Sequence, residues 1–146
     1  MGMSDDLYRL ADRYETYITQ LFRNAVKALT LEFIQPVQQG GRLPYRTGNL
    51  QRSLWVSTSG MAMIAGTRER FDDMQDFFAA IDAAKLGDTV YIALRAAYAY
   101  RMNYGFVGED SLGRFYNQAG YGFRENAAMR WPAILAEQRA AMGSPW

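Results

Sequence analysis

The chain has 146 residues, of which 49% are hydrophobic and 21% are charged, and its formal net charge is +1. This composition is typical of a single folded domain spanning residues 1–146, and it argues against a disordered chain and against a dedicated, strongly basic nucleic-acid-binding protein. Cysteine and histidine are both absent, which excludes disulfides, thiolate metal sites, histidine-based catalytic triads and most zinc sites.

The first predicted element is a long amphipathic helix over residues 4–36. Ser4 is expected to cap its N-terminus, where Asp5 and Asp6 suit the positive end of the helix dipole. Pro36 is expected to end or kink the helix, and Gly40-Gly41 to end it at the latest. Hydrophobic residues recur along it at intervals of three and four: Leu7, Leu10, Ala11, Tyr14, Ile18, Leu21, Phe22, Ala25, Val26 and Leu29. A helix of about 30 residues is roughly 45 Å long, whereas a domain of this length has a radius of gyration of only about 15 Å. Part of the apolar stripe is therefore expected to meet another subunit.

The body of the domain is predicted to follow over residues 47–146. Its expected elements are a strand hairpin over 53–59 and 61–67, a short helix from Asp72 to Ala84, a strand over 89–96, a segment over 97–104 that fits helix or strand, a glycine-rich loop over 105–121, and a final helix from Phe123 with a kink at Pro132. This order predicts an α+β fold with a small antiparallel sheet of three or four strands, a short inserted helix and a C-terminal helix.

The sequence contains no pattern typical of membrane targeting. Residues 1–6 lack the basic and apolar regions of a signal peptide, and no apolar run approaches the roughly 20 residues that span a bilayer. We therefore expect a soluble, intracellular product with no membrane partner.

Two groups of carboxylates are candidates for a metal site. Asp72, Asp73 and Asp76 cluster at the start of the predicted short helix, where they could hold a divalent cation, but helix capping explains the same spacing. Glu109 and Asp110 lie in a glycine-flanked loop that lacks the alternating ligands of a calcium loop. No serine lies in a nucleophile elbow, and no glycine cluster forms a phosphate-binding loop. The prediction is a protein that is not an enzyme and has no cofactor, no bound metal and no small-molecule substrate.

Aromatic residues are concentrated between Tyr98 and Trp131, where arginines and methionines are interleaved with them. These residue types are enriched in protein–protein interfaces, and a long loop that carries them is expected to dock on a neighbour. Two alternatives stay open: the rings could stack on single-stranded nucleic acid, or they could fold back onto the chain's own core. Fourteen of the 16 basic residues are arginine, which suits an interface but also follows from a GC-rich genome.

Three short motifs occur in a characteristic order. A proline, Pro44, precedes a Thr-Gly-X-Leu-X-X-Ser segment that begins at Thr47; Tyr98-Ala99 and Tyr104-Gly105 follow; and Gly122-Phe123 opens the final helix. In this order and spacing the chain resembles the tail-component family of long-tailed double-stranded DNA phages and gene transfer agents, whose members are called neck, head–tail joining, tail-completion or tail-terminator proteins. The resemblance extends from the N-terminal helix to about residue 141.

The resemblance implies a structural virion protein of the tail or neck, assembled in the cytoplasm of the bacterial host. Its expected partners are further copies of itself in a ring (a hexamer or dodecamer), the head–tail connector or stopper protein, the major tail protein, and double-stranded DNA that passes without sequence specificity. The alternative is a small, non-enzymatic, host-side protein–protein interaction module. The residues expected at subunit or ring interfaces are Thr47, Gly48, Asn49, Ser53, Tyr98, Tyr104, Gly105, Phe106, Phe115 and Tyr116.

Overall fold

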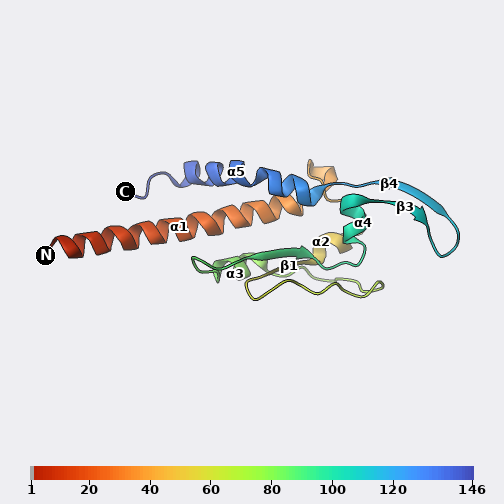
Figure 1. Cartoon of the computed structure of the whole chain (residues 1–146), viewed down its shortest axis with the longest axis horizontal. Helices are drawn as coiled ribbons and strands as arrows, with labels where there is room; N and C mark the ends of the chain where they lie inside the picture. The colour runs from red at the N-terminus through yellow and green to blue at the C-terminus, as the bar shows by residue number, and fades with distance from the viewer. Residues whose placement is uncertain (1) are drawn as a thin grey trace.

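The computed structural model describes residues 2–146, and its dominant feature is α1 (Met3–Phe33), which runs along much of an elongated molecule (Figure 1). Gly2, rather than the expected Ser4, occupies the N-cap position, and its backbone N–H donates to the Asp5 carboxylate at 3.3 Å. The helix ends at Phe33, three residues before Pro36, because a proline disfavours helical geometry in the residue before it.

The C-terminal helix α5 (Phe123–Met142) lies beside α1 and runs antiparallel to it (Figure 1). The helix begins at Phe123, as predicted, and Pro132 lies inside it without ending it. Ile134 is fully buried, and the rings of Phe123 and Phe33 meet edge to face with centroids 5.8 Å apart. The two helices therefore share one side of the hydrophobic core.

The predicted hairpin of residues 53–59 and 61–67 is wrong. The strand β1 (Leu54–Ser57) pairs instead with β2 (Tyr91–Leu94) in an antiparallel register that places Leu54 opposite Leu94. Leu54 and Val56 face the core, so this pairing buries the alternating face of β1. Residues 61–67 form no strand, because they have no alternating face to bury; they are attached to the body by the Ala65 N–H, which donates to the Arg95 carbonyl at 2.8 Å.

Residues 105–121, predicted as a loop, contain a second antiparallel pair of strands, β3 (Gly105–Glu109) and β4 (Phe115–Ala119). Asp110 closes the connection between them, since its carboxylate accepts the backbone N–H groups of Leu112 and Arg114 at 2.9 Å each. The α+β class is confirmed. However, the four strands form two separate two-stranded sheets and not one sheet of three or four strands.

Four short helices connect these parts: η1 (Val37–Gln39), α2 (Asn49–Arg52), α3 (Phe77–Asp82) and α4 (Ala99–Tyr104). The segment 97–104, whose sequence fits helix or strand, contains the helix α4. Asp76, and not Asp72, caps α3, because it directly precedes the first buried residue of the helix and its carboxylate accepts the Ala79 N–H at 3.2 Å. The core joins α2 and α3 to β1, α1 and α5, and its buried members are Val26, Ile34, Leu43, Leu50, Leu54, Val56, Phe77, Ile81, Ala96 and Phe123. Within residues 2–146, no helix is long and apolar enough to cross a membrane.

Candidate protein–protein interfaces

The Thr47-Gly48-Asn49 turn is shaped by its own backbone. Gly48 adopts a left-handed conformation with φ of +83°, which glycine tolerates best. A Cβ at this position would also meet the Arg52 guanidinium and would lie 2.7 Å from the Tyr45 hydroxyl. The Thr47 hydroxyl accepts the Asn49 N–H at 3.3 Å. Thr47 and Gly48 therefore set up the start of α2.

Asn49 connects this turn to two distant segments. Its Nδ2 donates to the Tyr98 hydroxyl at 3.0 Å, and its Oδ1 accepts the Phe71 N–H at 2.7 Å. The residue is only 8% exposed. Two of the sequence motifs, which are 49 residues apart, are thus brought into direct contact.

Ser53, in contrast, is only 1% exposed, and its hydroxyl donates to the Leu50 carbonyl at 2.6 Å. Its side chain closes α2 from inside the fold. Within the chain, Ser53 therefore has a buried, structural position, and its place at an interface stays a prediction.

A groove of about 610 Å³ opens beside the turn, and we call it the turn groove. It gathers four of the expected interface residues, Thr47, Gly48, Asn49 and Tyr98, together with aromatic side chains from Tyr45 and Tyr121. Arg46 also lines it. Among residues 2–146, no carboxylate forms an ion pair with Arg46 or with the nearby Arg42.

The other expected residues lie on or beside the β3–β4 hairpin, which projects from one end of the molecule (Figure 1). Every residue of β4 is exposed, including Phe115 at 67% and Tyr116 at 40%. Tyr104, at the end of α4, is also exposed, whereas Phe106 is half-buried under the Arg101 guanidinium, which lies 4.3 Å from its ring centroid. The hairpin aromatics therefore do not fold back onto the core.

Gly105 has a backbone role at the base of this hairpin. Its φ is +88°, and a Cβ there would lie 2.6 Å from the Gln118 carbonyl oxygen and 2.8 Å from the Gly120 nitrogen. Only glycine allows β4 to approach this closely. Gly105 thus has a backbone role and places its neighbours in the hairpin.

The first 14 residues of α1, residues 3–16, are all exposed, and we call this segment the α1 arm. Met3, Leu7, Leu10 and Tyr14 lie on the same helical face as Leu21, which is buried. The apolar stripe that packs into the core therefore continues uncovered toward the N-terminus, at the end of the molecule opposite the hairpin (Figure 1). Part of the stripe therefore has no cover within the chain, and its contact with another subunit stays a prediction.

Sequence reasoning missed a second groove, of about 600 Å³, between the two long helices and the β1–β2 sheet. Phe33, Leu94 and Phe123 line it, and the exposed Met61 and Ile64 form part of its edge. The sequence signal was the apolar run at residues 61–64, but it was assigned to a strand. Whether these side chains lie at the surface depends on the path of residues 61–67 beside the sheet.

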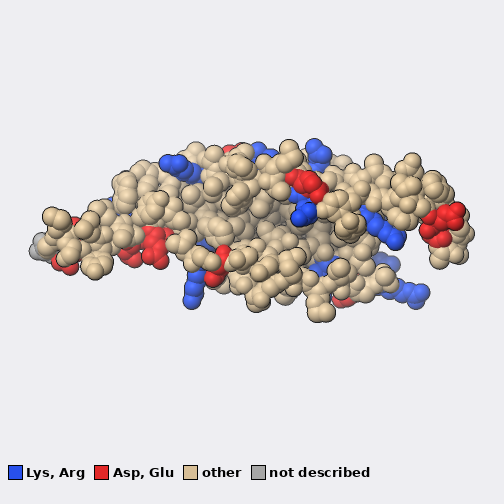
Figure 2. All heavy atoms as spheres, viewed as in Figure 1, with Lys and Arg blue, Asp and Glu red and all other residues tan. Residues whose placement is uncertain are grey.

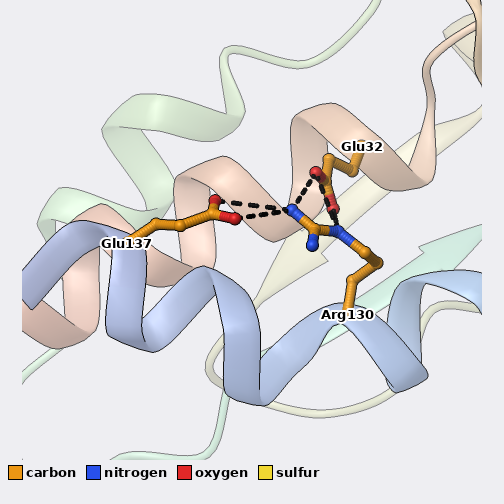
Figure 3. Close-up of polar contacts among 3 residues, drawn as sticks. All are labelled: Glu32, Arg130 and Glu137. Carbon is orange, nitrogen blue, oxygen red and sulfur yellow. Dashed lines mark hydrogen bonds and ion pairs between the residues drawn. The ribbon is translucent and has the colours of Figure 1, made fainter.

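A cluster of charged residues holds the two long helices in register (Figure 3). Arg130 of α5 donates to Glu32 of α1, with Nη2 and Oε1 3.0 Å apart, and its Nη2 also lies 3.1 Å from Glu137 Oε1. Hydrogen bonds to Glu32, and then to Glu137, raise the pKa of Arg130 above its ordinary value. These groups lie between helices and are all paired, so they stabilise helix packing.

Asn103 is another residue that sequence reasoning did not single out. It is 5% exposed, and its Nδ2 donates to the Glu125 carboxylate at 2.9 Å while its Oδ1 accepts the Arg124 N–H at 2.9 Å. The amide donation from Asn103 lowers the pKa of Glu125. This contact joins α4 to the start of α5, which orients the hairpin between them.

Charged side chains are distributed over the visible face without a continuous basic surface, and acidic groups occupy the tip of the hairpin (Figure 2). Within residues 2–146, no three acidic side chains approach closely enough to hold a metal ion. The chemistry available at the surfaces described above is that of apolar and aromatic contact with polar edges, which suits protein–protein association. Comparisons of the chain with protein-family models, with curated proteins and with solved structures each found no match.

Proposed function

We propose that the chain is a structural subunit of a homo-oligomeric ring at the head–tail junction, or at the top of the tail, of a long-tailed bacteriophage. In this role, a hexamer or dodecamer joins the connector to the tail tube and lets double-stranded DNA pass. The proposal assigns no catalytic role to the chain. It starts from the order of the Thr47–Ser53, Tyr98–Gly105 and Gly122–Phe123 motifs.

One structural observation carries the proposal: the chain exposes different apolar surfaces at its two ends (Figure 1). The α1 arm lies at one end, and the β3–β4 hairpin lies at the other, with Val107, Leu112 and Phe115 each more than 60% exposed. A monomeric protein rarely leaves such apolar surface uncovered. Two different surfaces suit a head-to-tail contact, which generates a ring when the rotation between subunits closes.

The charge distribution is compatible with DNA passing through the ring. The net charge is +1, and acidic groups occupy the hairpin tip (Figure 2). A lumen with a dense basic lining would add phosphate contacts and slow the transit of DNA. A nearly neutral subunit avoids this effect.

Native mass spectrometry across rising protein concentration, with negative-stain microscopy of the same sample, tests this function. We expect an open ring of six or twelve copies. If only monomers form, a second experiment adds the chain to tail tubes assembled from the phage's major tail protein. The proposal then requires rings of the chain at the ends of these tubes. A stable dimer that does not bind these tubes would reject the virion role and would favour the host-side interaction module.

A further inference from the structure

We infer that the α1 arm of one copy docks in the turn groove of the next copy and that this contact closes the ring. The inference rests on the proposed function and deepens it, because it names the two surfaces that meet. It assigns a binding role to the Thr47-Gly48-Asn49 turn and to the uncovered part of α1.

The arm presents three apolar side chains with the spacing of a helix that binds in a groove. Met3, Leu7 and Leu10 occupy positions i, i+4 and i+7 on one face and are 79%, 58% and 48% exposed. The next member of the stripe, Tyr14, is already stacked on Trp146, with ring centroids 6.1 Å apart. Trp146 therefore partly covers the stripe at Tyr14, which is still 50% exposed, and leaves the first three positions for a partner.

The turn groove has a suitable size and lining for these three side chains. Its volume of about 610 Å³ accommodates a few side chains but not a whole helix, which is about 10 Å across. Tyr45, Tyr98, Tyr121 and Met102 supply aromatic and polarisable walls, and these residue types are enriched at protein interfaces.

Complementary charge selects this groove as the site for the arm. Residues 2–16 contain four acidic and two basic residues, whereas residues 35–68 contain four arginines and no acidic residue. Arg46 lines the groove, and neither it nor Arg42 has an ion-pair partner within residues 2–146. Opposite charge across an interface favours encounter and fixes register.

Other pairings fit the same charges less well. Two arms packed against each other would bring together segments that both carry excess negative charge, which is unfavourable. The groove between the long helices has one charged lining residue, Arg124, which already donates to Tyr104 at 2.7 Å and lies 3.7 Å from Glu125. The turn groove therefore offers the arm both apolar contact and unpaired positive charge.

The arm and the groove lie at different positions along the long axis of the molecule, with the N-terminus at one end and α2 toward the other (Figure 1). A head-to-tail contact between them leaves one arm and one groove open until the ring closes, whereas a reciprocal exchange of arms would stop at a dimer. This explains how a single type of contact produces a closed assembly.

Engineered cysteines test the inference directly, because the chain has no cysteine of its own. Leu7→Cys places one thiol on the arm, and Val37→Cys places another at the groove, where Val37 is 47% exposed. The full-length double variant is treated with a short bis-maleimide cross-linker and separated on a denaturing gel. We expect a ladder of covalent multimers that ends at the ring number, whereas each single variant remains mainly monomeric.

The matched control is the Leu7→Cys/Leu112→Cys variant, whose second thiol lies at the exposed tip of the hairpin. A ladder from the control but not from the Val37 pair would place the arm on the hairpin and overturn the inference. Covalent dimers of the Leu7→Cys single variant would indicate arm-to-arm pairing and would also overturn it. Rings in native mass spectra without a Leu7–Val37 ladder would reject this docking but preserve the proposed function. The absence of rings both in native mass spectra and at the ends of tail tubes would reject the proposed function itself.

Discussion

Replacing Asn49 by alanine is expected to destabilise the fold by about 2 kcal/mol, because it removes the link between the turn, α4 and the segment at Phe71. The Asn49 amide donates to Tyr98 and accepts from the Phe71 N–H. Each lost hydrogen bond contributes about 0.5–1.5 kcal/mol, and a donor left unsatisfied costs about 1–3 kcal/mol. Tyr98 is half-buried and can recover a bond to water, so the lower part of the combined range applies.

Urea unfolding followed by circular dichroism measures this effect. With a slope of about 1–3 kcal/mol per molar urea, the midpoint should fall by roughly 1 M. All variants are compared at one protein concentration, because assembly raises apparent stability.

Two variants isolate the parts of this contact. Asn49→Asp keeps the acceptor for the Phe71 N–H and can accept from the Tyr98 hydroxyl, so it should lose less stability than Asn49→Ala at neutral pH. Tyr98→Phe removes only the hydroxyl and should cost about 1 kcal/mol or less. An Asn49→Ala midpoint equal to that of the unaltered protein would refute the reasoning, as would an Asn49→Asp loss as large as that of alanine.

Three further perturbations probe the hairpin and the arm. Gly105→Ala should destabilise the fold by roughly 1–3 kcal/mol, because φ is +88° and a Cβ would meet backbone atoms of β4. Gly113→Ala should cost only about 1 kcal/mol, because Gly113 has φ of +77° but open space around it. Equal melting temperatures for the two variants would contradict this ranking. Backbone hydrogen bonds, first that from the Arg114 N–H, lower the pKa of Asp110 from its ordinary value, so the folded state binds fewer protons than the unfolded state. The stabilisation from Asp110 is therefore present above its unfolded pKa and is lost as the pH falls through the lower folded pKa. Hydrogen exchange of the hairpin amides should show this loss of stability at low pH. The Asp110→Asn variant should not show this pH dependence. The double variant Leu7→Lys/Leu10→Lys should prevent ring formation in native mass spectra. It should change the free energy of unfolding by only about 0.5 kcal/mol, because both side chains are exposed. Rings that persist in this variant would exclude the arm from assembly.

Patterns within single elements predicted much of the helical structure. The repeat of threes and fours located α1 to within three residues of its observed end, and the apolar pattern from Phe123 located α5. These predictions succeed because an amphipathic helix is defined by contacts between residues three and four apart and by one buried face. The strand β2 was found for a similar local reason, since Tyr91–Leu94 lies within a run of alternating residues.

Strand pairing could not be predicted in the same way. The assignment of residues 61–67 as the partner of β1 relied on nearness in sequence, but β1 pairs with β2, so that Leu54 lies opposite Leu94. The glycines at 105, 108 and 113 indicated a loop, although Gly105 and Gly108 lie within β3. Glycine weakens the sequence signal for a strand, while the observed register depends on the close approach of the opposite strand.

For the candidate interfaces, the residue types can be read from the sequence: a cysteine- and histidine-free chain with an apolar helical stripe, a glycine-containing turn and many aromatic residues. Which of these residues are accessible follows from the packing of distant segments. Ser53 is buried, Asn49 contacts Tyr98, and the α1 arm and the β3–β4 hairpin are exposed at opposite ends of the molecule (Figure 1). The physical reason is that burial depends on contacts between residues far apart in the chain, whereas residue type and periodicity describe only the face that an element can bury.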